Sequence, residues 1–317
     1  MSIYGKGVMA GGKKPIILSV TNNGTWSRDG GYNPVTVNVS ASAVTSGTEI
    51  ITYNGDYDIT EFKNVSVIVG NFASTSPIDG LSYVNGLPSD WNIIKEIAKA
   101  ISEASDSINA NTTGSIYVSK GVTWAYKITP GDTINVNNHT YAVMGFNNFE
   151  LTNHSNYGGT HTTAGLTFGA VDCVATAKMN YSNTNSGGWR KCQMRTSTMP
   201  TLRNGMPATL AQVRVPYVDY NQSTILYSDD YMFLPAEKEV FGTRSYSPPA
   251  EANALTQFAY YKNGGNKIKS FSGSGVWWWL RSVNYSNGSI FCAVYTSGGA
   301  YYGGASNSFG VAPCFCV

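Results

Sequence analysis

The last 36 residues of the chain, Ser282–Val317, contain no Lys, Arg, Asp, Glu, Gln, His, Met or Trp. The whole chain is 13% charged, and 13% of 36 residues is about four or five charges. Tyr, Ser, Gly, Asn and Ala take their place, directly after the densest aromatic run of the chain, Val276–Arg281. Tyr supplies rigid contact area, and small polar residues adapt to a partner. The pattern predicts strands and turns that present a recognition surface.

Length and composition bound the fold class. A chain of 317 residues suits two or three domains, and 42% hydrophobic residues are enough for a packed core. The 34 Gly and 21 Tyr indicate β structure with many turns. The net charge of +2, with basic residues scattered along the chain, gives no electrostatic reason to expect a nucleic-acid partner.

Neither a membrane span nor a secretion signal is visible in the sequence. The longest apolar stretches fall far short of the roughly 20 residues that a bilayer-spanning helix needs. Met1–Ala10 lacks the apolar core of a signal peptide. We therefore expect that the protein is synthesised in a cytoplasm and does not insert into a membrane. Its composition nevertheless suits an outward-facing protein. A virion component released by lysis would reconcile the two.

The cysteines and histidines form no pattern that is typical of a disulfide framework or a metal site. The five cysteines are Cys173, Cys192, Cys292, Cys314 and Cys316. Their number is odd, none belongs to a Cys-x-x-Cys pair, and the three His show no metal-ligand spacing. We expect buried free thiols that pack as small hydrophobes, with neither a metal nor a cofactor.

An internal repeat occupies the front of the chain, after an N-terminal segment at 1–14. Thr21–Trp26 returns as Thr52–Tyr57, each with an Asn-Gly turn and a later alternating strand. The pattern predicts small β repeats at 15–40 and 46–70. Isolated hairpins are marginal in water, so the repeats need each other or a partner chain. They resemble short β repeats in tail proteins of phages that infect Gram-positive bacteria.

A helix is predicted after a linker at 71–88 that is rich in Gly, Pro and Ser. Ser89 is the expected cap, and the helix spans 89–110. Its apolar residues follow the spacing of a coiled-coil seam: Ile94, Ile97, Ile101, Ala104 and Ile108. Ile at both seam positions favours a trimer, and the place between the repeats and a large domain suits a short helical stalk. The alternative is an amphipathic helix packed on its own domain.

The rest of the chain, 119–317, is predicted to be one α+β domain. Short motifs follow one another along it: Gly131-Asp132-Thr133-Ile134, Gly145-Phe146, Gly188-Trp189, Met194-Arg195, Phe233-Leu234-Pro235, Glu239-Val240-Phe241-Gly242, Trp278-Trp279-Leu280-Arg281-Ser282 and Gly310-Val311-Ala312-Pro313. In this order they resemble C-type-lectin-like domains related to formylglycine-generating enzymes. More narrowly, the domain is similar to the variable proteins of diversity-generating retroelements.

We call Ser282–Val317 the tail of the chain. The resemblance implies that codons for this segment are rewritten in the gene. In that family a reverse transcriptase copies a template, misreads its adenines and changes codons near the 3′ end of the gene. An AAC or AAT codon randomised at its adenines cannot encode Lys, Glu, Gln, Met or Trp. Those five types supply 41 of the 317 residues here, and none follows Arg281. One departure is Ala312, where similar domains often have Arg, so an internal ion pair is expected to be absent.

The resemblance places the ligand-binding surface on the tail, where fixed-looking Phe291, Val294 and Ala305 are interleaved with candidate contact positions. Small residues and Tyr lose little side-chain entropy when they bind. The candidate positions are Tyr285, Asn287, Ser289, Ile290, Ala293, Tyr295, Thr296, Ser297, Gly299, Tyr301, Tyr302, Gly303, Gly304 and Phe309. The alternative is an ordinary Gly- and Tyr-rich β end with a structural role.

The aromatic run before the tail reads as a strand. Trp277–Trp279 would then alternate between its faces, and we expect at least two of the three in the core. The alternative is a platform on which sugar rings stack. Arg281 is expected to pair inside the fold rather than to meet a ligand.

The chain has two carboxylate pairs that could serve in acid–base chemistry. Asp229 and Asp230 would face opposite sides of a strand, which makes them a poor pair. Glu237 and Glu239 flank Lys238, as in a solvated turn. Lectin-type calcium binding is not expected, because the tail lacks carboxylates.

Reactive cysteine chemistry is not expected either. Formylglycine-generating relatives depend on it, but the segment around Cys314 and Cys316 has no cation that could lower a thiol pKa. The sequence thus predicts a protein that is not an enzyme.

The leading hypothesis is a phage tail receptor-binding protein, located in the virion tail. The repeats would contact other tail proteins, the helix would set a homotrimer, and the lectin-like domain would bind a host cell-surface protein or glycan. The second hypothesis is a bacterially encoded, retroelement-diversified binding protein. An enzyme of the formylglycine-generating type is the third.

Overall fold

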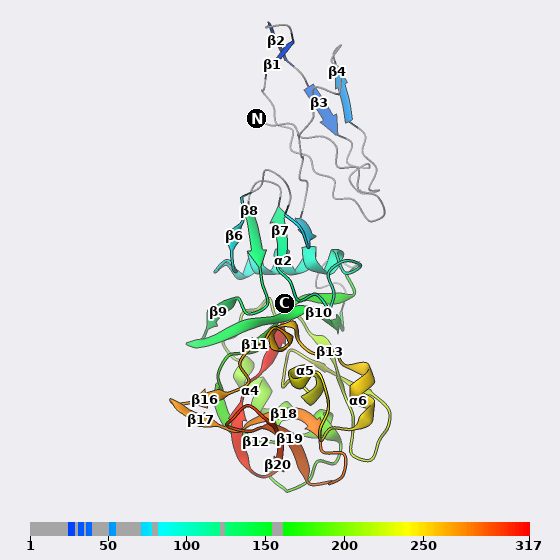
Figure 1. Cartoon of the computed structure of the whole chain (residues 1–317), viewed down its shortest axis with the longest axis vertical. Coiled ribbons are helices and arrows are strands. Elements are labelled where there is room, and N and C mark those ends of the chain that lie inside the picture. Colours follow the sequence, from blue (N-terminus) through cyan, green and yellow to red (C-terminus); the bar gives the residue numbers. More distant parts are fainter. Residues whose placement is uncertain are drawn as a thin grey trace.

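The structure, a computed structural model, describes residues 25–28, 31–34, 36–39, 51–54, 71–77, 82–120, 124–153 and 161–317. These residues form a mixed α+β fold in which strands predominate and most helices are short (Figure 1). The α+β class predicted from the sequence is confirmed.

Four short strands are described near the start of the chain. They form two antiparallel pairs: β1 (Thr25–Arg28) with β2 (Gly31–Pro34), and β3 (Thr36–Val39) with β4 (Ile51–Asn54). The predicted segment 1–14 lies outside the described residues, and so does much of the predicted repeats 15–40 and 46–70. The repeats therefore stay a prediction.

A four-stranded sheet begins where the sequence predicts a linker. Its strands are, in order, β5 (Asn71–Ser74), β7 (Ile116–Lys120), β8 (Trp124–Ile128) and β6 (Val84–Asn85). β5 and β6 lie inside the predicted linker 71–88, and the predicted domain start at Ser119 falls within β7. Ala73 pairs with Val118, and both are buried. Short strands in a Gly- and Pro-rich stretch have the same composition as a linker. Only their pairing with the distant strands β7 and β8 shows that they are strands.

Helix α2 (Trp91–Glu103) lies with its apolar side against β11 (Thr163–Ala170) of the same chain. Ile97 and Ile101 are fully buried. A Cβ atom on Gly165 of β11 would overlap the carbonyl oxygen of Ala98, so the helix lies directly on the strand. The row of apolar residues that suggested a coiled-coil seam is covered by its own chain. This favours the alternative of a packed amphipathic helix, and the seam lends no support to a trimer.

Polar side chains mark both ends of α2. The N-cap is Asp90 rather than the predicted Ser89, and its Oδ1 accepts the N–H of Asn92 at 2.8 Å. Buried Asn147 donates from Nδ2 to the carbonyl oxygens of Ile101 and Ile108, at 2.8 and 2.7 Å. The helix ends at Glu103, short of the predicted boundary at 110, and the bond from Asn147 satisfies the Ile101 carbonyl group in its last turn.

The largest sheet joins the middle of the chain to its end. Its strands are β14 (Leu226–Asp230), β13 (Val213–Tyr217), β10 (His139–Leu151), β11, β22 (Cys314–Cys316) and β15 (Met232–Phe233), with β9 (Thr133–Val136) also paired to β10. Asn137 and Asn138 form the turn of the β9–β10 hairpin, at φ of 50° and 63°. In the centre of the sheet, Phe315 of β22 stacks on Phe168 of β11 at 5.2 Å.

The tail forms most of a second, five-stranded sheet. Its order is β12 (Ala175–Lys178), β21 (Ser308–Val311), β18 (Trp278–Val283), β19 (Ile290–Val294) and β20 (Ala300–Gly304). The hairpin of β16 (Lys269–Phe271) and β17 (Ser274–Val276) precedes β18. In Figure 1 the strands of this sheet lie away from α2, at the opposite end of the C-terminal half.

Short helices connect the two larger sheets. They are α3 (Gly188–Lys191), the π-helical η3 (Met194–Thr198), α4 (Met199–Arg203), α5 (Glu237–Phe241), α6 (Pro249–Ala254) and α7 (Ala259–Lys262). Within the described ranges, no helix combines the length and apolar character needed to cross a membrane. All five cysteines are buried free thiols, as predicted.

Candidate functional site

Strand β18 is the central strand of the sheet that carries the predicted contact positions, and all six of its residues are buried. Trp278 donates from Nε1 to the Lys267 carbonyl oxygen, and Trp279 donates from Nε1 to that of Ala177, each at 2.9 Å. Both indoles are fully buried, so the prediction that at least two of the three tryptophans lie in the core is confirmed. Trp277, just before the strand, is partly exposed.

Trp277 is the centre of a group of aromatic side chains. Its ring centroid lies 4.9 Å from that of Tyr295, 4.8 Å from that of Tyr301 and 5.0 Å from that of Phe309. Tyr301 stacks on Tyr302 at 5.0 Å. Tyr302 meets the ring of Tyr246 edge-on at 4.8 Å. We call this set of connected rings the aromatic band: Tyr246, Trp277, Tyr295, Tyr301, Tyr302 and Phe309.

The aromatic band is accessible to solvent at the edge of the sheet. β20 is the last strand in the sheet order and carries Tyr301 and Tyr302. Tyr295 and Tyr301 are 40% and 38% exposed, and Tyr285 in the neighbouring loop is 48% exposed. Large aromatic surfaces exposed together on a rigid sheet are typical of interaction sites.

Twelve of the fourteen predicted contact positions lie at least partly in solvent. They are Tyr285, Asn287, Ser289, Ile290, Tyr295, Thr296, Ser297, Gly299, Tyr301, Tyr302, Gly304 and Phe309. The other two, Ala293 and Gly303, are buried, so their selection as contact residues is corrected. Ala293 pairs with Trp279 and Tyr301 in the middle of the sheet. A Cβ atom on Gly303 would overlap the ring of Phe309, so no larger residue fits there without displacing it.

The turn and the loop that present these residues are fixed by local hydrogen bonds. Gly298 has a φ of 85°, and its N–H donates to the Tyr295 carbonyl oxygen at 2.8 Å in the β19–β20 turn. Asn287 accepts the N–H and hydroxyl of Ser289 at 3.0 and 2.7 Å. Buried Asn185 donates from Nδ2 to the Asn287 carbonyl oxygen at 2.8 Å. These bonds hold the exposed side chains on a defined backbone.

The sequence reasoning missed two residues that border the tail, Arg244 and Tyr246. Tyr246 belongs to the aromatic band, and its carbonyl oxygen accepts the N–H of Tyr285 at 2.9 Å. The guanidinium carbon of Arg244 lies 5.4 Å from the centroid of the Tyr285 ring. No local pattern signals these contacts, because the loop that carries both residues is distant from the tail in sequence.

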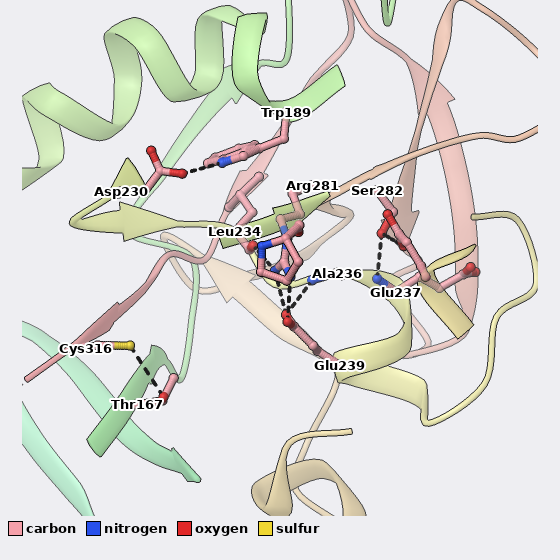
Figure 2. Close-up of polar contacts among 12 residues, drawn as sticks. Thr167, Trp189, Asp230, Leu234, Ala236, Glu237, Glu239, Arg281, Ser282 and Cys316 are labelled. Atoms are coloured by element: carbon pink, nitrogen blue, oxygen red, sulfur yellow. Dashed lines mark hydrogen bonds and ion pairs between the residues drawn. The ribbon is translucent and has the colours of Figure 1, made fainter. Parts of the chain in front are cut away.

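Arg281 and Glu239 form a buried ion pair, which Figure 2 shows. Arg281 of β18 is completely buried, and its two terminal nitrogens donate to the two carboxylate oxygens of Glu239 at 2.6 and 2.5 Å. Its remaining bonds reach the carbonyl oxygens of Pro216 and Leu234, at 2.8 and 2.9 Å. The expectation that Arg281 pairs inside the fold is confirmed.

The two glutamates of α5 hold backbone groups in the interior. Glu239 also accepts the N–H of Ala236 at the start of the helix, at 2.9 Å. The Glu237 carboxylate accepts the N–H groups of Tyr246 and Ser247, at 3.0 and 2.8 Å. Both glutamates are buried, so the predicted solvated turn is wrong. Their charge is compensated by Arg281 and by backbone donors that the local sequence does not reveal.

Ser282 links the network to a third carboxyl group (Figure 2 labels Ser282 and Glu237). Its hydroxyl accepts the N–H of Glu237 at 2.9 Å and donates to the carboxylate of Glu251 at 2.6 Å. Burial raises the pKa of Glu251 to about 7, although the Ser282 hydroxyl and the Arg281 charge act in the opposite direction. The network therefore connects β18, α5, α6 and the loop that carries Tyr246.

In the other carboxylate pair, Asp229 and Asp230, the buried member has a structural role. Asp229 is exposed and Asp230 is buried, as strand alternation predicted. Asp230 accepts the Trp189 indole N–H at 2.9 Å (Figure 2). It also accepts the Arg195 Nε–H at 2.6 Å. These bonds occupy the buried carboxylate and separate it from its neighbour.

Cys314 and Cys316 are buried free thiols. Burial raises the pKa of Cys316 to about 12 and raises that of Cys314 further. Within the ranges that the structure describes, no group of three or more His, Cys, Asp or Glu side chains could hold a metal ion.

Comparison with known proteins identifies one part of the chain. A family model described as "Domain of unknown function (DUF6273)" matches residues 170–317. The matched segment contains β12–β22, and thus the aromatic band and the buried network, but not α2. No curated protein and no solved structure matches the chain.

Replacing Glu239 tests the buried ion pair. Glu239→Gln leaves Arg281 buried without a counter-charge, so we expect the free energy of unfolding to fall by about 3–5 kcal/mol in urea titrations. Glu150→Gln is the matched control, because Glu150 pairs with Arg214 on the surface, where an ion pair contributes about 0–1 kcal/mol. Equal losses in the two variants would contradict the assignment.

Glu251 predicts a specific dependence of stability on pH. Its pKa rises from an ordinary value of 4.5 to about 7 on folding, so the folded state binds the proton more tightly. The contribution of Glu251 to the free energy of unfolding is therefore greatest at low pH. It is lost as pH rises from about 4.5 to about 7, by an amount on the order of 2–3 kcal/mol between pH 5 and 8. Glu251→Gln should lack this component, because Gln does not ionise. The measurement is urea unfolding of both proteins at pH 5 and 8, and identical pH dependences would exclude the buried acid.

Proposed function

We propose that the protein is a phage tail receptor-binding protein whose C-terminal domain has a C-type-lectin-like fold and binds a ligand on the host surface. The observation that carries this proposal is the aromatic band, which presents exposed rings at the edge of a sheet backed by a buried ion pair. The residues of the tail itself carry no charge, so little desolvation of charge opposes contact with a partner.

The physical design of the surface supports a binding role. Exposed Tyr, Ser, Gly and Asn residues lie on strands and tight turns whose interior residues are buried, so the surface can change while the fold survives. Aromatic anchors surrounded by small adaptable residues have the composition of a paratope. The high pKa values of Cys314 and Cys316 favour this role over thiol catalysis.

The wider assembly is part of the same proposal. The front repeats would attach the protein to other tail proteins, and a homotrimer would multiply the affinity of a single site. The alternative, a bacterially encoded and retroelement-diversified binding protein, uses the same surface. Neighbouring genes separate the two, because tail-assembly genes favour the first and their absence favours the second.

Diversification predicts a pattern in the DNA. We expect a near-copy of the 3′ end of the gene beside a reverse transcriptase gene, with adenines at codons for exposed positions such as 295, 297, 299 and 301. Codons 293 and 303 should be free of such adenines, because larger side chains there would disrupt the buried sheet. Sequencing the flanking DNA checks this, and adenines placed equally at buried and exposed codons would argue against a diversified surface.

Binding to cells tests the role of the aromatic band. The purified full-length protein should bind intact cells of at least one strain in a panel of Gram-positive bacteria. The double variant Tyr295→Ala/Tyr301→Ala should bind at least about 30-fold more weakly, because aromatic anchors each contribute about 2 kcal/mol or more. Flow cytometry measures the titration.

Tyr227→Ala is the matched control, since Tyr227 is an exposed tyrosine on β14 in the other large sheet. It should bind like the unmodified protein, and thermal melting should show that all variants fold. Equal binding by the double variant, or no binding to any strain, would reject the proposed surface.

A further inference from the structure

The part of the chain that carries the aromatic band presents cations but no side-chain carboxylates to solvent. Residues 231–317 are all described, and their three carboxylates, those of Glu237, Glu239 and Glu251, are buried. Four cations of the same segment are at least partly exposed: Lys238, Arg244, Lys262 and Lys267. A free surface with this imbalance is complementary to an anionic partner.

Among the described residues, carboxylates from earlier in the chain form no ion pair with Arg244. Asp172 accepts the N–H and hydroxyl of Ser270 at 2.7 and 2.9 Å. Asp219 accepts the N–H of Tyr220 at 2.7 Å. Neither forms an ion pair with Arg244, and the ion pairs found among the described residues leave Arg244 out.

Arg244 differs from the other exposed cations because it borders the tail in a fixed position. Its guanidinium lies beside the Tyr285 ring, and one terminal nitrogen donates to the Ser247 carbonyl oxygen at 2.8 Å. The N–H of Ser247 is itself held by buried Glu237. Lys238, by contrast, donates to the Gly242 carbonyl oxygen of its own helix end. An arginine held in this way is preorganised to bind a carboxylate through its remaining donors.

The geometry of the rings favours a polypeptide over a sugar. Tyr301 and Tyr302 stack face to face, so each ring covers one face of the other, and Trp277 contacts three further rings at tilted or edge-on angles. A pyranose ring needs an open aromatic face, whereas apolar side chains and peptide carbonyl groups can use ring edges and Tyr hydroxyl groups.

We infer that Arg244 is a constant anion-binding residue of this surface, and that the partner is an acidic polypeptide segment. A carboxylate of the partner pairs with Arg244, and its apolar side chains contact the aromatic band. This inference rests on the proposed function, because it assigns a ligand class to the same surface. Arg244 precedes the tail, so the contact stays the same whatever residues the tail carries.

The test uses the full-length protein and a defined probe, the random copolymer of glutamate and tyrosine. Binding by biolayer interferometry should be detectable at 50 mM NaCl, and Arg244→Gln should weaken it at least about 10-fold. Arg244→Lys should fall between the two, because it keeps the charge but loses the bidentate fork. Lys262→Gln, which removes an exposed cation from α7, should change the affinity less than about two-fold.

Three results would overturn the inference. They are no binding of the copolymer, equal losses in Arg244→Gln and Lys262→Gln, and tighter Arg244-dependent binding of hyaluronan, an anionic glycan. The cell assay separates this inference from the proposed function. If Tyr295→Ala/Tyr301→Ala abolishes cell binding while Arg244→Gln leaves it intact, only the acidic ligand is wrong. If the tyrosine variant still binds cells, the proposed surface itself fails.

Discussion

The ion pair of Arg281 and Glu239 is the interaction on which the rest of the C-terminal domain depends. Arg281 lies in a strand that is buried along its whole length, so its charge can be tolerated only if every direction of the guanidinium meets an acceptor. Glu239 supplies two of these acceptors and also binds the start of α5. One pair therefore fixes the position of a central strand relative to a helix, and Glu237 extends the same constraint to the loop that carries Tyr246.

The charge-free tail follows from this arrangement. β18 is covered on both sides, and β19, between β18 and the edge strand β20, buries most of its side chains. Charged residues in such strands would need partners like Glu239, and the tail provides none. Variation is compatible with the fold only where side chains leave the sheet, at the β19–β20 turn, along one side of β20 and in the loop of Tyr285. Ala293 and Gly303 belong to the tail, but the fold does not tolerate larger residues at these positions. Ala293 pairs with Trp279, and a Cβ atom on Gly303 would overlap the ring of Phe309.

Features with a local cause could be predicted from the sequence. The aromatic run indicated the burial of two tryptophans, and strand alternation separated Asp229 from Asp230. Features that depend on a distant partner could not. The isoleucines of α2 have the spacing of a coiled-coil seam, and only the close approach of Gly165 shows that they face β11. The burial of Glu237 and Glu239 is likewise invisible without Arg281 and the loop at Ser247, which lie elsewhere in the sequence.

If the tail is diversified as proposed, the same long-range bonds would divide the candidate surface into constant and changeable parts. Tyr246 contacts Tyr302 in the aromatic band, yet its backbone is held by Glu237 and its position does not depend on the tail sequence. Arg244 shares this loop and borders Tyr285. A partner that docks on the tail would therefore always meet one aromatic ring and one guanidinium from the framework. Exchange of tail residues would then change which partners bind. The contacts with Tyr246 and Arg244 would still fix the orientation of the partner on the surface.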